Sequence, residues 1–288
     1  MNAILWEILE QNLTVAEKEW LQEKDATRPM ELMTAFVAAP RYLSKQIVQP
    51  DVSHALELAQ QLPGFSVMGW SLVRLSRVWL LTCLDTTDRE AYVRHLETLF
   101  DTAEMNELVA LYSALPLLAY PEQWLFRATE AVRSNMGVVF DALALQNPYP
   151  ARYFTDLAWN QLVLKTIFND KPIHLIVGLD ERANEKLART LSDFAHERWA
   201  AGRSVAPEVW RLVSKFLDEA LLEDIKYLFN SGSQHDREAA ALTCFQAEYP
   251  PAHALLAKYP ELEKSVQHKK LSWADLEFND LNTYVSKP

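Results

Sequence analysis

Side chains that could do chemistry gather between Asn147 and Arg203, in the middle of the chain. This stretch combines histidine, carboxylate, lysine and guanidinium groups with three prolines. Such groups can bind a small anion, exchange protons, or stabilise one another in a polar network. We assign no catalytic role. The candidate residues for binding a ligand or partner are Asn147, Asn160, Lys165, Asp180, Arg182, His196, Glu197, Trp199 and Arg203.

The sequence lacks the signatures of several enzyme classes. Its six glycines are scattered, so no glycine-rich loop could hold a phosphate, and no GxSxG motif is present. His196 and Glu197 resemble the start of a zincin motif, but the position of its second histidine is Ala200. We therefore predict neither a cofactor nor a metal site. The sequence leaves open whether the protein is an enzyme and favours a role without catalysis.

Two interpretations of the polar residues stay open. Asn160 and Lys165 lie in the apolar segment LAWNQLVLKTIF, where a buried amide and ammonium would need partners such as the Asp180 carboxylate or free backbone carbonyls. A packing network explains them as well as a ligand site does. Asp180 is a suitable N-cap for a helix that follows it, and an exposed helix N-terminus beside Arg182 and Lys165 could hold a carboxylate or phosphate.

The helix that contains His196 can likewise be interpreted in two ways. Arg189, Asp193, His196 and Glu197 recur at spacings of three and four, so they share roughly one helix face. They form either a solvated row of ion pairs, with Arg189 paired to Asp193, or the polar wall of a groove with Trp199 as its apolar floor.

The elements that must position these residues are predicted to be helices almost throughout. Apolar residues recur with helical spacing, and Thr14 with Glu17 has the spacing of a capping box. Short connections between helices produce antiparallel neighbours. We predict a single all-α domain over residues 1–288. It is either a stack of antiparallel helix pairs, as in an irregular HEAT-like α-solenoid, or a compact multi-helix bundle. No fixed repeat period is found.

Composition and charge exclude several classes of partner. The formal net charge of -11 disfavours nucleic acid and anionic membrane surfaces. The most apolar run, residues 67–84, contains Arg74 and Arg77 near its centre, which favours a buried helix over a membrane span. The N-terminus has no basic leader and no cleavage site. We therefore expect a cytoplasmic protein that is not embedded in a membrane and does not bind nucleic acid.

Several motifs resemble the EboA-domain family, mainly over residues 147–276. They are NPYPARYF, WNQLVLK, IVGLDERAN, DFAHERWAAGR, PEVWRLV, REAAALTCFQAEYPPAHALLAKYPELEK and LSWADL. The matching motif positions include Asn147, Pro148, Trp159, Asn160, Lys165, Gly178, Asp180, His196, Glu197, Arg198, Trp199, Arg203 and Trp210. The segment NDKPIHL after Phe168 is a locally polar variant, so no family contact is carried over to that turn.

The resemblance implies a place among the proteins of a biosynthetic pathway. Members of the family are encoded beside a prenyltransferase-like membrane protein, a TatD-like hydrolase, a sugar-isomerase-like barrel and a dehydroquinate-synthase-like cyclase. This cluster is associated with making or exporting a small secondary metabolite, including a precursor of a cyanobacterial sunscreen pigment. The resemblance defines no activity for the family itself.

Two hypotheses for the function follow. The first is a helical scaffold or adaptor that supports biosynthesis or export of a small secondary metabolite, without catalysis of its own. Its partners would be the pathway proteins encoded nearby, among them the prenyltransferase-like membrane protein. The alternative is a small-molecule-binding protein, or an unrecognised enzyme, that uses the polar residues 147–203 to hold a small polar ligand.

Overall fold

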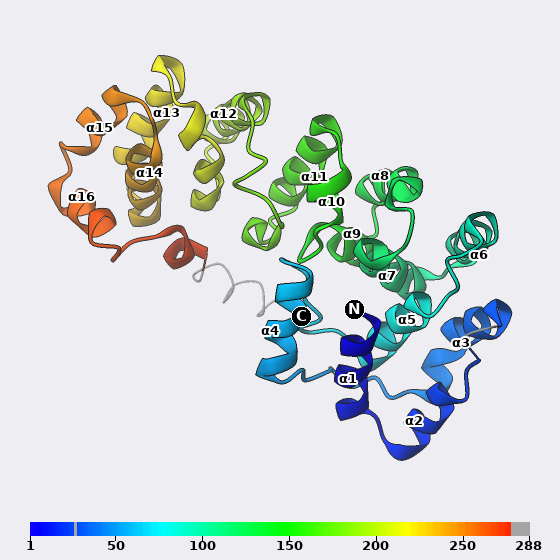
Figure 1. The fold of residues 1–288 in the computed structure, drawn as a ribbon. Helices are drawn as coiled ribbons and strands as arrows, with labels where there is room; N and C mark the ends of the chain where they lie inside the picture. The colour runs from blue at the N-terminus through cyan, green and yellow to red at the C-terminus, as the bar shows by residue number, and fades with distance from the viewer. Residues whose placement is uncertain (26–27, 278–288) are drawn as a thin grey trace. The chain divides into compact units, whose positions relative to one another are not determined.

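The computed structural model describes residues 1–25 and 28–277 (Figure 1). Within these residues every regular element is an α-helix or a short 3-10 helix, and the β-type pairing is one isolated antiparallel bridge between Ile47 and Ser71. The predicted all-α fold is therefore confirmed. None of the helices in the described residues is long and apolar enough to span a membrane.

Backbone contacts group the chain into two compact units, Met1–Trp159 and Asn160–Pro288. The boundary falls inside a helix, and each unit has its own buried apolar residues. The prediction of a single domain over 1–288 stays a prediction, and its last positions lie outside the described residues.

The first unit is a succession of short helices. They are α1 (Asn2–Asn12), α2 (Val15–Gln22), α3 (Pro29–Tyr42), α4 (Val52–Gln61), α5 (Leu72–Thr82), α6 (Arg89–Thr102), α7 (Met105–Ala114), η1 (Leu115–Leu117), η2 (Pro121–Trp124), α8 (Leu125–Arg133), α9 (Gly137–Ala144) and α10 (Tyr149–Tyr153). From α3 onward, each odd-numbered helix contacts the next odd-numbered helix: α3 contacts α5, α5 contacts α7, and α7 contacts α9 (Figure 1). This order is typical of stacked helix pairs.

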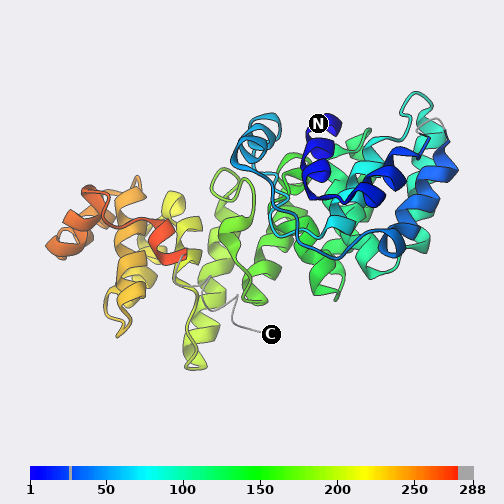
Figure 2. The same cartoon turned by 90° about the horizontal axis from the view of Figure 1, so that it is seen from below.

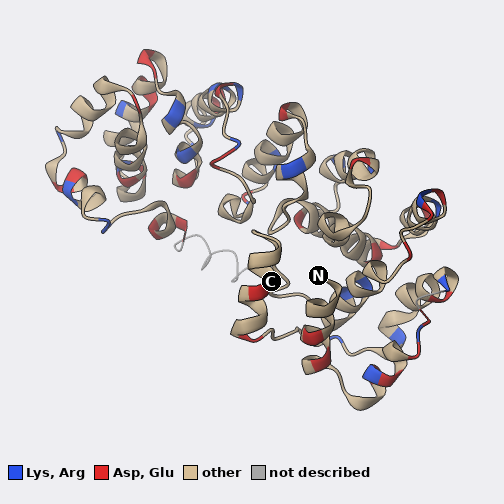
Figure 3. Ribbon diagram, viewed as in Figure 1, with Lys and Arg blue, Asp and Glu red and all other residues tan. Residues whose placement is uncertain are grey.

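The second unit contains a helical segment over residues 273–277, which has no label in Figure 1, and the remaining helices. They are α11 (Asp156–Phe168), η3 (Ile173–Leu175), α12 (Glu185–Ala200), η4 (Pro207–Leu212), η5 (Ser214–Phe216), α13 (Glu219–Phe229), α14 (Gln234–Gln246), α15 (Pro250–Leu256) and α16 (Pro260–Gln267). Helix α13 packs between α12 and α14, as Figure 2 also shows. Acidic and basic residues share the same helices in this unit, most clearly along α12 (Figure 3).

Local sequence signals account for many of the helix ends. The predicted capping box forms: the Glu17 carboxylate accepts from the Thr14 N–H at 2.8 Å, and the Thr14 hydroxyl accepts from the Glu17 N–H at 3.4 Å. The side chains of Asp51, Ser71 and Asp88 cap α4, α5 and α6 in a similar way. Each cap satisfies a helix N–H group that would otherwise lack a partner.

The buried guanidinium of Arg77 joins three helices of the first unit. Arg77 lies on α5 and is 2% exposed. Pro40, inside α3, has no N–H to donate to the carbonyl of Phe36, four residues earlier. Arg77 Nε donates to that carbonyl at 2.9 Å, and Nη2 donates to the buried Glu107 carboxylate of α7 at 3.0 Å. Arg77 therefore satisfies a carbonyl that a proline left open, as well as a buried charge.

We predict that Arg77→Met destabilises the first unit by about 3–5 kcal/mol, because it strands the Glu107 carboxylate and the Phe36 carbonyl together. Glu107→Gln in the same chain should recover part of that loss by removing the stranded charge. Pro40→Ala should recover a further part by restoring the missing N–H. Denaturant unfolding of the single, double and triple variants measures the free energy of unfolding of each. Strictly additive changes in this free energy would contradict the three-way contact.

Candidate functional site

The candidate residues do not all belong to one unit. Asn147 lies in the first unit and is 3% exposed. Its Nδ2 donates to the carbonyls of Tyr112 and Ala142, each at 3.0 Å, and its Oδ1 accepts from the Tyr149 N–H at 3.0 Å. The amide therefore ties the ends of α7 and α9 to the start of α10, and these structural contacts use both of its polar atoms.

Asn160 pairs with another amide rather than with Asp180. Asn160 Nδ2 donates to Asn184 Oδ1 at 3.1 Å, and Asn184 Nδ2 donates to Asn160 Oδ1 at 2.8 Å. Asn184 Oδ1 also accepts from the Leu187 N–H at 3.0 Å and so caps α12. The expectation that Asp180 caps this helix is wrong, because the turn after Asp180 delays the first helical residue to Glu185.

The Asp180 carboxylate instead binds Arg211 in a two-pronged ion pair. Arg211 Nε donates to Oδ1 at 2.8 Å and Nη2 donates to Oδ2 at 2.7 Å, while Lys215 Nζ donates to the Asp180 carbonyl at 2.6 Å. Arg211 also pairs with Glu277. This geometry is the strongest that arginine and a carboxylate form, and it holds the loop before α12 against η4.

Lys165 and Arg182 occupy intermediate positions. Lys165 is partly buried on α11, as its apolar neighbours predict, and burial, together with the charge of Lys171, lowers its pKa. Arg182 is half-buried and its backbone N–H donates to the Gly178 carbonyl at 3.0 Å. Glu197 and Arg203 are exposed. The candidate residues of the second unit are thus distributed over several separate contacts.

The exposed side chain of His196 contacts a buried carboxylate between α12 and α13. Asp224 of α13 is 3% exposed and accepts from the Ser192 hydroxyl at 2.6 Å. Its other oxygen lies 2.5 Å from His196 Nε2. The carboxylate stands between the serine and the histidine, whereas nucleophilic catalysis needs the histidine to contact the hydroxyl. This cluster orients the ring of His196 but does not activate Ser192.

Trp199 continues the same contact between the two helices. Its ring stacks on Tyr227 at a centroid distance of 4.1 Å and on Trp210 at 5.7 Å. Trp210 is 1% exposed and Tyr227 is 51% exposed, so the stack leads from the core to the surface. The indole therefore packs against two other rings, and its place as the floor of a groove stays a prediction.

The polar face of α12 pairs with the residue that caps α13 and, through Arg189 and Glu185, along its own length. Arg189 donates to the Asp218 carboxylate at 3.2 and 2.5 Å and lies 3.4 Å from Glu185. The expected pairing of Arg189 with Asp193 is therefore wrong. Asp218 caps α13, and the hydrogen bond from Arg189, followed by that from the Leu221 N–H, lowers the pKa of Asp218 to about 2.

A second candidate surface lies on α3, which sequence reasoning did not identify. The buried face of α3 carries Leu32, Met33, Ala35, Phe36 and Ala39. Its exposed side carries Thr34 and Arg41 but also large apolar or aromatic residues, where polar residues are usual: Met30 is 67%, Val37 48% and Tyr42 55% exposed. Trp20 of α2 stacks on Tyr42 with ring centroids 4.7 Å apart. We call Trp20, Met30, Val37 and Tyr42 the α3 surface.

Two hollows flank the α3 surface. The hollow toward α2 has a volume of about 390 Å³ and is lined by Trp20, Lys24, Met30 and Thr34, among others. The hollow toward α6 has a volume of about 330 Å³ and is lined by Val37, Arg41, Leu99 and Thr102, among others. An apolar helix face between two hollows can receive the side chains of a partner helix.

The charges beside the α3 surface are mainly basic. Lys24 Nζ lies 5.0 Å from the centroid of the Trp20 ring, and Arg41 is exposed. In the described residues neither side chain forms an ion pair, whereas the nearby Glu31 lies 4.0 Å from Arg28. A partner with acidic side chains on either side of its apolar stripe would complement this arrangement.

We predict that Asp218→Asn changes the acid stability of the second unit without removing the cap of α13, because asparagine also caps helices. Because the pKa of Asp218 is lower in the folded than in the unfolded chain, its charge stabilises the fold. This stabilisation is complete above the unfolded pKa of about 3.9 and is lost as the pH falls toward about 2. The difference in denaturation midpoint between wild type and variant should therefore shrink over this window. A constant difference would contradict the ionic role.

Comparison with known proteins shows that the chain matches a protein family. The family model described as metabolite traffic protein EboA matches residues 1–214. The match begins upstream of the motifs noted over residues 147–276, covers the whole first unit and continues through α12 and η4. Curated proteins and solved structures gave no match. Because the family model covers well over half of the 288 residues, this chain belongs to the EboA family of metabolite traffic proteins.

Proposed function

We propose that this protein is a helical adaptor in metabolite traffic, which binds other proteins of its pathway in the cytoplasm and performs no catalysis of its own. The α3 surface is the observation that carries the proposal. It presents Met30 and Val37, seven residues apart on one side of α3, together with the stacked rings of Tyr42 and Trp20, on a helix whose inner face is already buried.

The binding partner proposed for this surface is an amphipathic helix. Its apolar residues, three or four positions apart, would enter the hollows on either side of α3. Acidic residues beside that stripe would meet Lys24 and Arg41. We propose that such a helix belongs to one of the proteins encoded beside EboA-family members, including the prenyltransferase-like membrane protein or a soluble enzyme of the cluster, and that the metabolite is a small secondary product.

The arrangement of the polar stretch supports an adaptor over an enzyme that uses residues 147–203. Asn147, Asn160, Asp180 and His196 each engage a different structural partner, and they do so at separate places. Such contacts stabilise the helices and their connecting loops. The alternative of a small-molecule site has better support from residues of the same stretch that were not among the candidates, such as Asp170 and Arg198.

We predict that Val37→Asp weakens binding of the partner by about tenfold or more, because a charge would enter an apolar contact. The measurement is calorimetric titration of the full chain with each purified neighbouring pathway protein. Val138→Asp on α9 is the matched control, since Val138 is 49% exposed and Val37 48%. The control should bind as wild type does.

Charge reversal provides an independent arm of this experiment. Lys24→Glu with Arg41→Glu should also weaken binding, and the loss should diminish at high salt. Absence of binding by every neighbouring protein would refute the adaptor proposal. Equal binding by Val37→Asp and wild type would refute the α3 surface as its location.

A further inference from the structure

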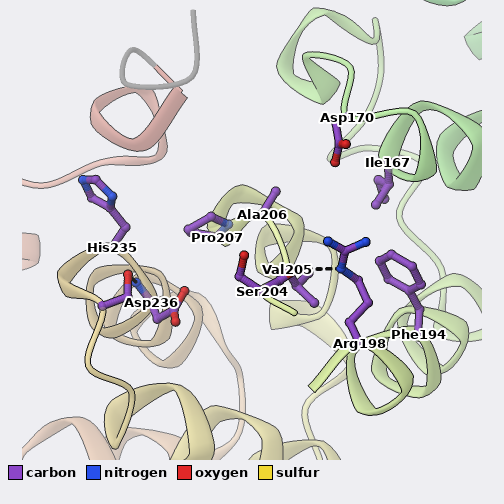
Figure 4. Close-up of a pocket in the computed structure, with 11 residues that line it drawn as sticks. Ile167, Asp170, Phe194, Arg198, Ser204, Val205, Ala206, Pro207, His235 and Asp236 are labelled. Carbon is purple, nitrogen blue, oxygen red and sulfur yellow. Dashed lines mark hydrogen bonds between the residues drawn. The ribbon is translucent and has the colours of Figure 1, made fainter. Parts of the chain in front are cut away.

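A hollow in the second unit lies between the end of α12 and the start of α14. Its volume is about 330 Å³, within the range of sites for small molecules. The lining residues that matter for recognition are Ile167, Asp170, Phe194, Arg198, Ser204 and His235 (Figure 4). We call it the α12–α14 hollow. None of the nine candidate residues for binding a ligand or partner is among the residues that line it.

The turn that ends α12 positions a guanidinium in this hollow. Gly202 adopts a positive φ of 68°, and the Arg203 N–H donates to the Arg198 carbonyl at 2.8 Å, which reverses the chain. The reversal places the Ser204 carbonyl where Arg198 Nε donates to it at 2.6 Å. Within the described residues, Nη1 and Nη2 of Arg198 have no hydrogen-bond or ion-pair partner. Two donors of a fixed, planar group are therefore available to an anion.

The other walls differ in chemistry. Phe194 lies beside Arg198, with the guanidinium carbon 5.5 Å from its ring centroid, and its ring also packs on Phe168 at 4.7 Å. With the buried Ile167 it forms an apolar side. Asp170 lies on the side toward which the guanidinium points (Figure 4), and it forms no ion pair with any described residue. An acceptor for a hydroxyl or ammonium thus stands near the anion-binding group.

We propose that the α12–α14 hollow binds a small organic acid that carries a hydroxyl or ammonium group beside its carboxylate and a short apolar chain. The carboxylate accepts from the Nη groups of Arg198. The hydroxyl or ammonium donates to Asp170, and the apolar chain contacts Phe194 and Ile167. This inference is independent of the adaptor proposal, because it concerns a different unit and different residues.

Three acids that share one carbon skeleton test the proposal: leucine, 2-hydroxy-4-methylpentanoate and 4-methylpentanoate, with inorganic phosphate as the fourth probe. Calorimetric titration of the full chain should show millimolar or tighter binding of leucine or the hydroxy acid, and weaker binding of the unsubstituted acid. Asp170→Asn should remove most of the advantage of leucine, because its ammonium loses the opposite charge, and should reduce that of the hydroxy acid less, because the amide oxygen still accepts from the hydroxyl. Asparagine suits the positive φ of 50° at this position, so the variant should fold.

Arg198→Gln should weaken all organic acids by about tenfold, the loss expected for one charged hydrogen-bond pair. Arg133→Gln, an exposed arginine of the first unit, is the control and should leave binding unchanged. Phosphate that binds as well as the organic acids would overturn the proposed selectivity. The site would be overturned if Arg198→Gln left the binding of every organic acid unchanged. The comparison is made in chains whose unfolding transition is the same as that of wild type.

Discussion

The first unit depends on how one buried cation is satisfied. Pro40 interrupts the hydrogen bonding of α3 and leaves the Phe36 carbonyl without its intrahelical donor. Arg77 donates to this carbonyl and to Glu107, and so joins α3 and α7 to α5. A guanidinium can do this because it presents several donors in one plane, whereas a lysine would offer a single point charge. The inner face of α3 is thereby fixed to the helices behind it.

The consequence for function concerns the outer face of α3. A helix held on its inner side by a buried ion pair, a hydrogen bond and apolar contacts presents its outer side chains in a fixed arrangement. Rigid presentation lowers the entropy lost on binding, because fewer backbone states must be ordered. For the proposed adaptor, Met30 and Val37 on this helix would need little ordering when a partner binds.

The sequence predicts the class of fold and several local features. Helical periodicity gives the all-α class, and Thr14 and Glu17 form the capping box that their spacing indicates. The arginines in the run 67–84 mark a buried helix rather than a membrane span, and Arg77 is buried there. These successes share a cause: each depends on residues that are close in sequence, where helix geometry alone fixes the neighbours.

Contacts between distant segments were less predictable. Asp180 pairs with Arg211, and His196 pairs with Asp224. About 30 residues separate the members of each pair, and the sequence pattern does not show which residues so far apart will meet. Asp224 did carry a signal, because it occupies an inward position among Leu221, Ile225 and Leu228 on α13. The α3 surface and the α12–α14 hollow were missed, since exposure and concavity depend on packing between helices.

The most direct test of the central claim is hydrogen exchange along the full chain, alone and with each purified neighbouring pathway protein. A partner helix seated on the α3 surface should slow exchange in α2, α3 and the facing end of α6, because bound amides open less often. Exchange in α13 and α14 should not change. Slower exchange confined to the second unit, or no change in α3 with a partner that binds, would contradict the claim that the first unit is the docking surface.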